Sequence, residues 1–123
     1  MDSTGIVSSF DGYHPAIASG AYVDCSARLI GRVTIESTVL IWPGAVLRAE
    51  DEQIIIGEGG AVLDLCLLEA PDGYDVTVAK GALISHKACI QGATVRSGAI
   101  VGIGAIVLDG AVIGEGAIIG AGA

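Results

Sequence analysis

The sequence predicts an all-β fold in which short parallel strands wind into one coil with three flat sides. The first observation behind this prediction is that an aliphatic residue recurs every six residues along most of the 123-residue chain. The second is that a small or slender residue follows most of these aliphatic residues four positions later. The third is the presence of 19 glycines, because the tight corners between short strands often require a positive φ. A period of six fits neither a helical stripe nor a two-residue alternation, so each hexad is expected to form one side of a prism.

The repeat divides the chain into an N-terminal leading segment, residues 1–16, and a single β-helix domain, residues 17–123. A small residue in each hexad, Ala45 or Cys66 for example, shares the interior with the aliphatic one, because two bulky residues per side would overfill it. Three sides make a coil of about eighteen residues, which predicts about five to six coils stacked roughly 4.8 Å apart. The aliphatic residues expected to point inward are Ile17, Val23, Leu29, Ile35, Ile41, Leu47, Ile56, Val62, Leu68, Val78, Ile84, Ile90, Val95, Val101, Val107, Ile113 and Ile119.

Extra residues interrupt the hexad register twice, and each insertion is expected to be a polar segment outside the coil, while the repeat at residues 90–94, IQGAT, is one residue short. The first contains the acidic run Glu50–Glu52, which is expected to be a solvated bend. The second lies around Pro71–Tyr74 and is expected to be a loop between coils. The chain also stops within a hexad, at Ile119–Ala123, although a stack of coils needs a cap over its open end. We therefore expect a missing segment or a partner protein to cover the last coil.

Composition excludes several classes of function. The net charge is −8 and only six residues are Lys or Arg, which excludes a nucleic-acid-binding surface because such a surface needs clustered basic side chains. Glycines and charged residues interrupt each apolar run before it reaches the length of a membrane span. The N-terminus lacks the basic and apolar regions of a secretory signal. Three cysteines without CxxC spacing predict reduced thiols, with Cys66 in the core, and we expect a cytoplasmic protein.

The hexads resemble those of the hexapeptide-repeat proteins, whose motif is an aliphatic residue, often a glycine, two variable residues and a small residue. The resemblance covers residues 17–123 and implies a left-handed parallel β-helix. General chirality rules alone would favour right-handed crossovers, so the hand comes from the resemblance. Related proteins usually follow the last coil with a C-terminal helix, which is expected to be absent here.

Within this superfamily the chain is similar to the γ-class carbonic anhydrases. Residues 41–48, IWPGAVLR, match the phrase I-W-P-x-A-V-L-R that opens the active region of those enzymes. Residues 84–92, ISHKACIQG, match their I-G-H-x-A-x-x-H-G, and residues 101–110 match the segment that follows. The resemblance implies a homotrimer in which three histidines, two from one subunit and one from its neighbour, bind Zn²⁺ or Fe²⁺. That metal would lower the pKa of a bound water, and the resulting hydroxide attacks CO₂.

Carried onto this sequence, the resemblance gives Glu69, His86 and Gln91 as the three metal-ligand positions. Only His86 keeps an imidazole, and the carboxamide of Gln91 is a weak ligand. Glu50, Glu69 and His86 are the candidate catalytic residues, but Leu63 stands where the family has a glutamine that positions the metal-bound water. Glu69 and Gln91 each follow an inward aliphatic residue, so they are expected to stack on one outer face, one strand apart.

Arg48 and Asp64 match two residues that the family pairs as a structural ion pair across subunits. A retained trimer scaffold around a changed metal site predicts a γ-carbonic anhydrase-like protein with weak or no CO₂ hydration and a structural or assembly role. If the protein is active, it is a carbonate dehydratase of the lyase class that acts on CO₂ or bicarbonate.

Two other functions stay open. One is an enzyme with an altered metal site, in which His86 and Glu69, completed by Gln91 or water, hold Fe²⁺, Mn²⁺ or Zn²⁺. The other is acyl transfer, the second large use of this fold, with an acyl-CoA bound between coils and His86 as general base. Because no second histidine lies nearby, the alternative is that His86 is a surface or interface residue that pairs with Glu69 across an interface, with no metal bound.

Overall fold

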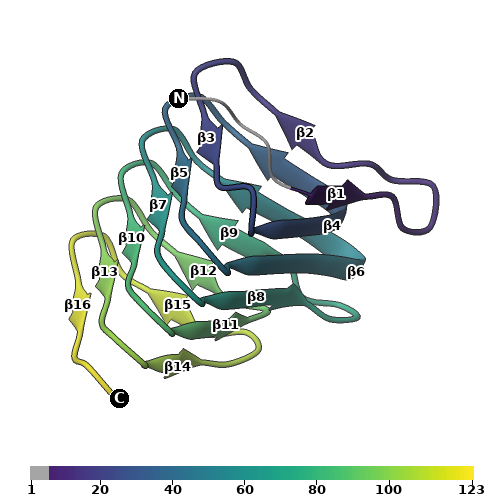
Figure 1. Ribbon diagram of the computed structural model, residues 1–123. Coiled ribbons are helices and arrows are strands. Elements are labelled where there is room, and N and C mark those ends of the chain that lie inside the picture. The colour runs from purple at the N-terminus through teal and green to yellow at the C-terminus, as the bar shows by residue number, and fades with distance from the viewer. Residues whose placement is uncertain (1–5) are drawn as a thin grey trace.

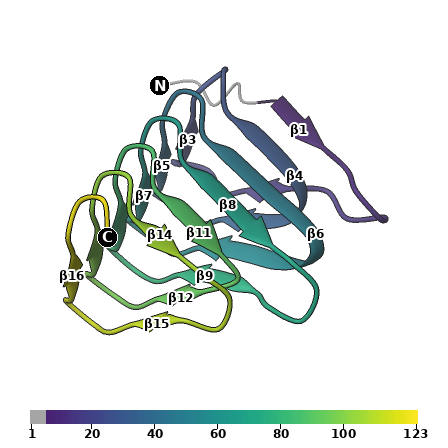
Figure 2. The same cartoon turned by 90° about the horizontal axis from the view of Figure 1, so that it is seen from below.

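The computed structural model describes residues 6–123, and within this range the chain forms strands and turns without a helix (Figure 1). The strands pair in parallel and stack into a prism with three sides, so the predicted all-β, single parallel β-helix is confirmed. Because the described residues form no helix, none of their elements has the length and apolarity of a membrane-spanning helix. Figure 2 shows the stacked coils from below, with the chain turning from one side to the next.

Side one of the prism is a six-stranded sheet in which each strand comes from a successive coil. The chain therefore makes five full turns between the first and the last of these strands, which is within the predicted range of five to six coils. The strands of side one are β3 (Tyr22–Val23), β5 (Leu40–Ile41), β7 (Ala61–Val62), β10 (Leu83–Ile84), β13 (Ile100–Val101) and β16 (Ile118–Ile119).

Sides two and three are joined as one ten-stranded sheet, because β4 (Arg28–Ile35) and β6 (Val46–Ile56) run around the corner between them. Side two contains the first halves of these strands together with β1 (Ile6–Ser8), β8 (Leu67–Ala70), β11 (Cys89–Gln91) and β14 (Ile106–Val107). Side three contains their second halves together with β2 (Ala16–Ile17), β9 (Val76–Val78), β12 (Thr94–Val95) and β15 (Val112–Ile113). The parallel ladder begins at β1, inside the segment that was expected to precede the coils.

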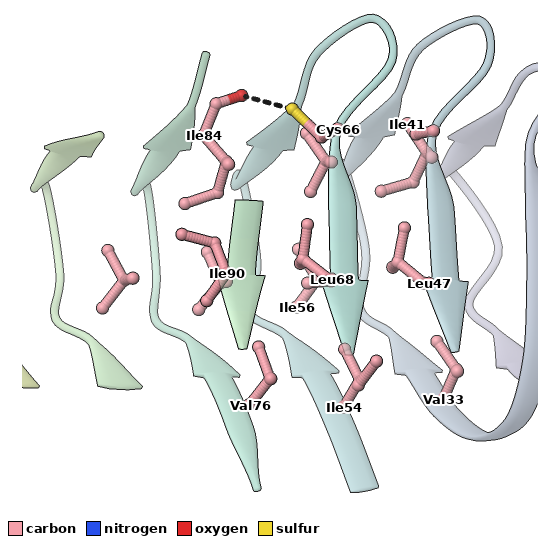
Figure 3. Packing of buried hydrophobic residues seen from close by; sticks show 14 of the residues in the cluster. Val33, Ile41, Leu47, Ile54, Ile56, Cys66, Leu68, Val76, Ile84 and Ile90 are labelled. Carbon is pink, nitrogen blue, oxygen red and sulfur yellow. Dashed lines mark hydrogen bonds between the residues drawn. The ribbon is translucent and has the colours of Figure 1, made fainter. Parts of the chain in front are cut away.

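The interior is filled by the side chains that the hexad pattern places there (Figure 3). Every predicted inward aliphatic residue from Val23 to Val107 is at most 5% exposed, while Ile17, Ile113 and Ile119 at the two ends are only partly buried. Cys66 occupies a small inward position as predicted, and its thiol donates a 2.8 Å hydrogen bond to the carbonyl of Ser85. Removal from water raises the pKa of the Cys66 thiol. The three cysteines are free thiols.

We call the edge between sides two and three the loop corner, because every interruption of the repeat lies there. It comprises residues 9–15, 31–32, 50–53 and 71–75 of successive coils. The second predicted loop, Pro71–Tyr74, is confirmed as a turn between β8 and β9. The prediction of a bend at Glu50–Glu52 was wrong, since these residues continue the strand β6. They form a bulge there, because residues 50–53 of β6 stand opposite Arg32 alone in β4.

Hydrogen bonds tie the extra residues of the loop corner to one another. The amide of Gln53 donates to Asp75 Oδ1 at 3.1 Å, and the amide of Gly73 donates to Glu52 Oε2 at 3.1 Å. Tyr74 then lies across Gly92 of the next coil, where an added Cβ would be only 2.6 Å from the Tyr74 Cβ. The inserted residues are therefore a packed edge of the prism, outside the ladders of sides one and two.

Candidate functional site

Three polar side chains form a row along the outer surface of side two. Arg48 in β6 pairs in register with Glu69 in β8, and Glu69 pairs in register with Gln91 in β11. Their neighbours Leu47, Leu68 and Ile90 are fully buried, so alternation along each strand directs the polar residues outward (Figure 3). The expected stacking of Glu69 on Gln91 is therefore present, and Arg48 extends the same row by one coil.

Arg48 contacts two carboxylates on one edge of its guanidinium. Its Nη2 donates a hydrogen bond to Glu69 Oε2, and its Nε lies 2.7 Å from Glu50 Oε1. The Nε contact is an ion pair whose angle is not that of a hydrogen bond, so this buried nitrogen has no hydrogen-bond partner. The exposed fractions of the side chains are 43% for Arg48, 36% for Glu50 and 21% for Glu69. Solvent therefore screens Glu69 least of the three.

His86 lies on the edge between sides one and two, which we call the histidine corner (residues 63–66 and 85–88). Its Nδ1 is 3.2 Å from Asp64 Oδ1, one coil earlier in the stack. The two side chains are 48% and 44% exposed. Leu65 and Lys87, which follow them, have positive φ values of 62° and 61°. Glycines such as Gly44 and Gly104 adopt the same conformation at other turns of the coil, so Leu65 and Lys87 take a backbone position that favours glycine.

The predicted site residues fall into two separate groups within one chain. Arg48, Glu50, Glu69 and Gln91 lie where side two meets the loop corner, while Asp64 and His86 lie at its opposite edge. The predicted pairing of His86 with Glu69, and that of Arg48 with Asp64, would each join two subunits, and both stay predictions. Within the chain, Arg48 contacts Glu50 and Glu69 instead, and Asp64 contacts His86.

The donor set at the predicted metal position does not fit a resident Zn²⁺ or Fe²⁺. Glu69 is already bound by the Arg48 guanidinium, and the carboxamide of Gln91 is neutral. Leu63 cannot hydrogen-bond a metal-bound water. Among residues 6–123, no three Asp, Glu, His or Cys side chains converge closely enough to hold a metal ion.

The sequence could have shown the Arg48–Glu69 contact. Once Glu69 is stacked on Gln91, the same coil spacing places Arg48 beneath Glu69, and opposite charges that are directly opposed across strands attract. The Asp64–His86 pair follows in the same way from their matching places in successive turns. The sequence does not predict the bulge of β6, from which Glu50 reaches the same guanidinium.

A second polar cluster on the first described coils was not predicted. The Asp24 carboxylate accepts hydrogen bonds from the hydroxyl and the amide of Ser26 and from the hydroxyl of Tyr22, at 2.6, 3.0 and 2.8 Å. These bonds, those from Ser26 foremost, hold the pKa of Asp24 below its ordinary value. Tyr22 also packs edge-on against Trp42, with 5.9 Å between ring centroids. The cluster fastens the turn after β3 to the turn after β5.

Comparisons with known proteins agree with the repeat and the fold. No protein-family model matches the chain. The carnitine operon protein CaiE of Escherichia coli O157:H7 is 34% identical over 87 residues, which are 71% of this chain and 44% of that protein. CaiE of Escherichia coli O1:K1 shows the same identity and coverage. The chain thus spans less than half the length of the curated relatives that it matches.

Two solved structures share the architecture. A hexapeptide transferase family protein from Anaplasma phagocytophilum superposes with a TM-score of 0.81 and 29% identity, over 95% of this chain and 76% of that one. A Bacillus cereus protein described as a candidate acetyltransferase superposes with a TM-score of 0.71 and 22% identity, over 97% and 76%, and at that identity the likeness shows the fold alone. The hexad repeat, the coil and these relatives together place the chain in the hexapeptide-repeat superfamily of left-handed β-helix proteins.

Proposed function

We propose that the protein is a homotrimeric, γ-carbonic anhydrase-like scaffold that has lost most or all CO₂ hydration and serves a structural or assembly role. The observation that carries this proposal is the contact between Arg48 and Glu69. In the family that the sequence resembles, the position of Glu69 holds a metal-binding histidine. Here that position holds a carboxylate neutralised by an arginine of the same chain, so a metal ion would have to displace a fixed cation.

The outer surfaces of sides one and two support the proposed trimer. Each has one mainly apolar outward row, and side two carries beside it the polar row of Arg48, Glu69 and Gln91. The outward row of side three is mixed, with Thr34, Thr77 and Thr94 in register with Ile55 and Val112. Side one presents Tyr22, Leu40, Ala61, Leu83, Ile100 and Ile118, and side two presents Val46, Leu67, Cys89 and Ile106. Apolar rows on two adjacent sides suit closed three-fold packing, in which each subunit contacts both neighbours.

The proposal predicts three results for protein purified without chelator. Sedimentation equilibrium should give three times the 12.3 kDa mass of the chain. Elemental analysis after exposure to Zn²⁺ or Fe²⁺ should find much less than one metal ion per chain, and CO₂ hydration should stay near the uncatalysed rate. Stoichiometric metal that is lost in His86→Ala, together with CO₂ hydration, would instead establish the enzyme with altered ligands and refute the scaffold.

A second candidate function is acyl transfer from an acyl-CoA, and the pairing of His86 with Asp64 favours it. A carboxylate at Nδ1 fixes the imidazole so that Nε2 is free to accept a proton from an acceptor hydroxyl or amine. The description of the Anaplasma relative as a transferase agrees with this chemistry. The described residues of one chain enclose no pocket, so a neighbouring subunit would have to complete the acyl-CoA site.

Acetyl-CoA binding distinguishes the two candidates. If the protein is a transferase, acetyl-CoA should raise its thermal midpoint, and desulfo-CoA should compete. His86→Ala should then abolish acetyl transfer to a panel of amine and hydroxyl acceptors. His14→Ala is a matched control, because His14 bonds Ser9 within the loop corner, away from Asp64. No response to acetyl-CoA at millimolar concentration would remove this candidate and leave the scaffold in place.

A further inference from the structure

The carboxylates of Glu50 and Glu69 are held close together by one arginine. Nε and Nη2 are neighbouring atoms on the same edge of the planar guanidinium, which presents its N–H groups as a rigid fork. Glu50 therefore approaches from the bulge of β6, and Glu69 from β8, to the same edge of Arg48. Two negative charges placed this close together repel strongly unless a cation lies between them.

Among residues 6–123, no other cation contacts these carboxylates. Glu50 and Glu69 take part in two of the three ion pairs of the described residues, and in both the partner is Arg48. Gln91, on the other side of Glu69, is neutral and cannot replace that charge. Removing the guanidinium would therefore leave two facing carboxylates with a carboxamide oxygen next to them, an all-oxygen donor set of the kind that hard divalent cations prefer.

We propose that Arg48 acts as a built-in cation that occupies the place of a metal ion, so that the protein folds and assembles without metal and a metal site becomes available only when Arg48 is removed. This inference rests on the proposed function as a scaffold without a working metal site. The arginine then has a specific role. In the native chain its guanidinium keeps a metal ion away from Glu50 and Glu69, and in a variant without the arginine these two carboxylates bind the ion instead.

The test is the thermal midpoint of Arg48→Met, which keeps a flexible apolar stem and removes the guanidinium and its charge. Without divalent cations, we expect the midpoint to fall by about 3–6 °C, the order of shift that a small loss of stability gives in a chain of this size. Addition of about 1 mM Mn²⁺ should restore at least half of that loss in the variant and leave the native chain unchanged. Arg28→Met is the matched control, because Arg28 lies on the same side of the prism and its guanidinium bonds the neutral Ser8 hydroxyl.

A second variant shows whether charge repulsion is the cause. In Arg48→Met/Glu69→Gln the repulsion is gone, so the midpoint should recover without Mn²⁺ and should no longer respond to it. The inference is overturned if Arg48→Met has the native midpoint, if Mn²⁺ stabilises it no more than it stabilises Arg28→Met, or if the native chain binds Mn²⁺ through Glu69. Sedimentation of the same samples reports the trimer separately, so a monomeric native protein would refute the proposed scaffold while the Mn²⁺ response still decides the role of Arg48.

Discussion

Gly31 is the position where an added methyl group should be most damaging, and the structure offers two glycines for comparison. Gly31, Gly44 and Gly98 have positive φ values of 81°, 74° and 69°. A Cβ on Gly31 would lie 2.2 Å from the carbonyl oxygen of Ala49 in the adjacent strand. On Gly44 it would lie 2.5 Å from the Cδ2 of Leu65, and on Gly98 it would meet nothing within 4 Å. Substituting alanine at all three positions therefore varies the steric contact at nearly constant backbone conformation.

The magnitudes follow from two separate costs. Placing an L-residue with a Cβ in the left-handed region costs about 1–2 kcal/mol, and Gly98→Ala should show this cost alone. Gly31→Ala adds an overlap with backbone that can be relieved only by moving β4 away from β6, and overpacking of this kind costs about 1–3 kcal/mol more. We therefore expect Gly31→Ala to lose about 2–5 kcal/mol. The loss of stability in Gly44→Ala should lie between the other two, because the end of the exposed Leu65 side chain can rotate away from the new methyl group.

Urea unfolding measured at one protein concentration tests this order, because unfolding of an oligomer depends on concentration. The three variants should lose stability in the order Gly98, Gly44, Gly31, with at least about 1 kcal/mol between the first and the last. Equal losses of stability in Gly31→Ala and Gly98→Ala would refute the reasoning. They would show that β4 and β6 can move apart near Ala49 to accommodate a methyl group with no loss of free energy.

Three further predictions concern the core, the thiols and acid stability. Leu68→Ala, at a fully buried position, should destabilise the fold by about 2–5 kcal/mol, whereas Leu108→Ala, at a 57% exposed position, should change its urea midpoint little. Iodoacetamide at pH 8 should label the exposed Cys25 quickly and Cys66 only after unfolding, because burial raises the pKa of Cys66 and shields it; rapid mass-spectrometric detection of labelled Cys66 would contradict this. The depressed pKa of Asp24 means that its contribution to stability is complete above the ordinary carboxyl pKa of 3.8 and is lost as the pH falls through the lower folded value. A carboxyl titration by NMR should therefore give Asp24 a midpoint below 3.8, and a midpoint at or above 3.8 would contradict the hydrogen-bond network.

The hexad pattern predicted the interior of the fold well because each coil repeats the same packing problem. A position such as Ile41 or Ile90 faces the same narrow space as its neighbours above and below, so period and residue size determine its direction. The acidic run Glu50–Glu52 was harder to interpret. Its polarity suggested a bend, but strand β6 continues through it, because hydrogen bonds to the next loop hold the backbone extended.

The sequence predicts which side chains lie next to one another in the candidate site, but it predicts fewer of the contacts that they make. The inward neighbours Leu68 and Ile90 fix the register of Glu69 and Gln91, and this part of the prediction follows from periodicity alone. The contacts of Arg48 depend also on side-chain reach and on the β6 bulge, neither of which has a periodic signal. The cross-subunit pairs depend on the surfaces of neighbouring copies and stay predictions.

The loop corner has a consequence for how proteins of this shape can change in length. Residues can be added at that edge without shifting the hexads on either side, since each extra segment leaves the ladder after side two and rejoins it at side three. The coils of this chain already differ in length at that edge while sides one and two remain in register. A foreign peptide grafted between Asp72 and Gly73 should therefore be displayed on the outside of a rigid rod, at a height set by the coil that carries it.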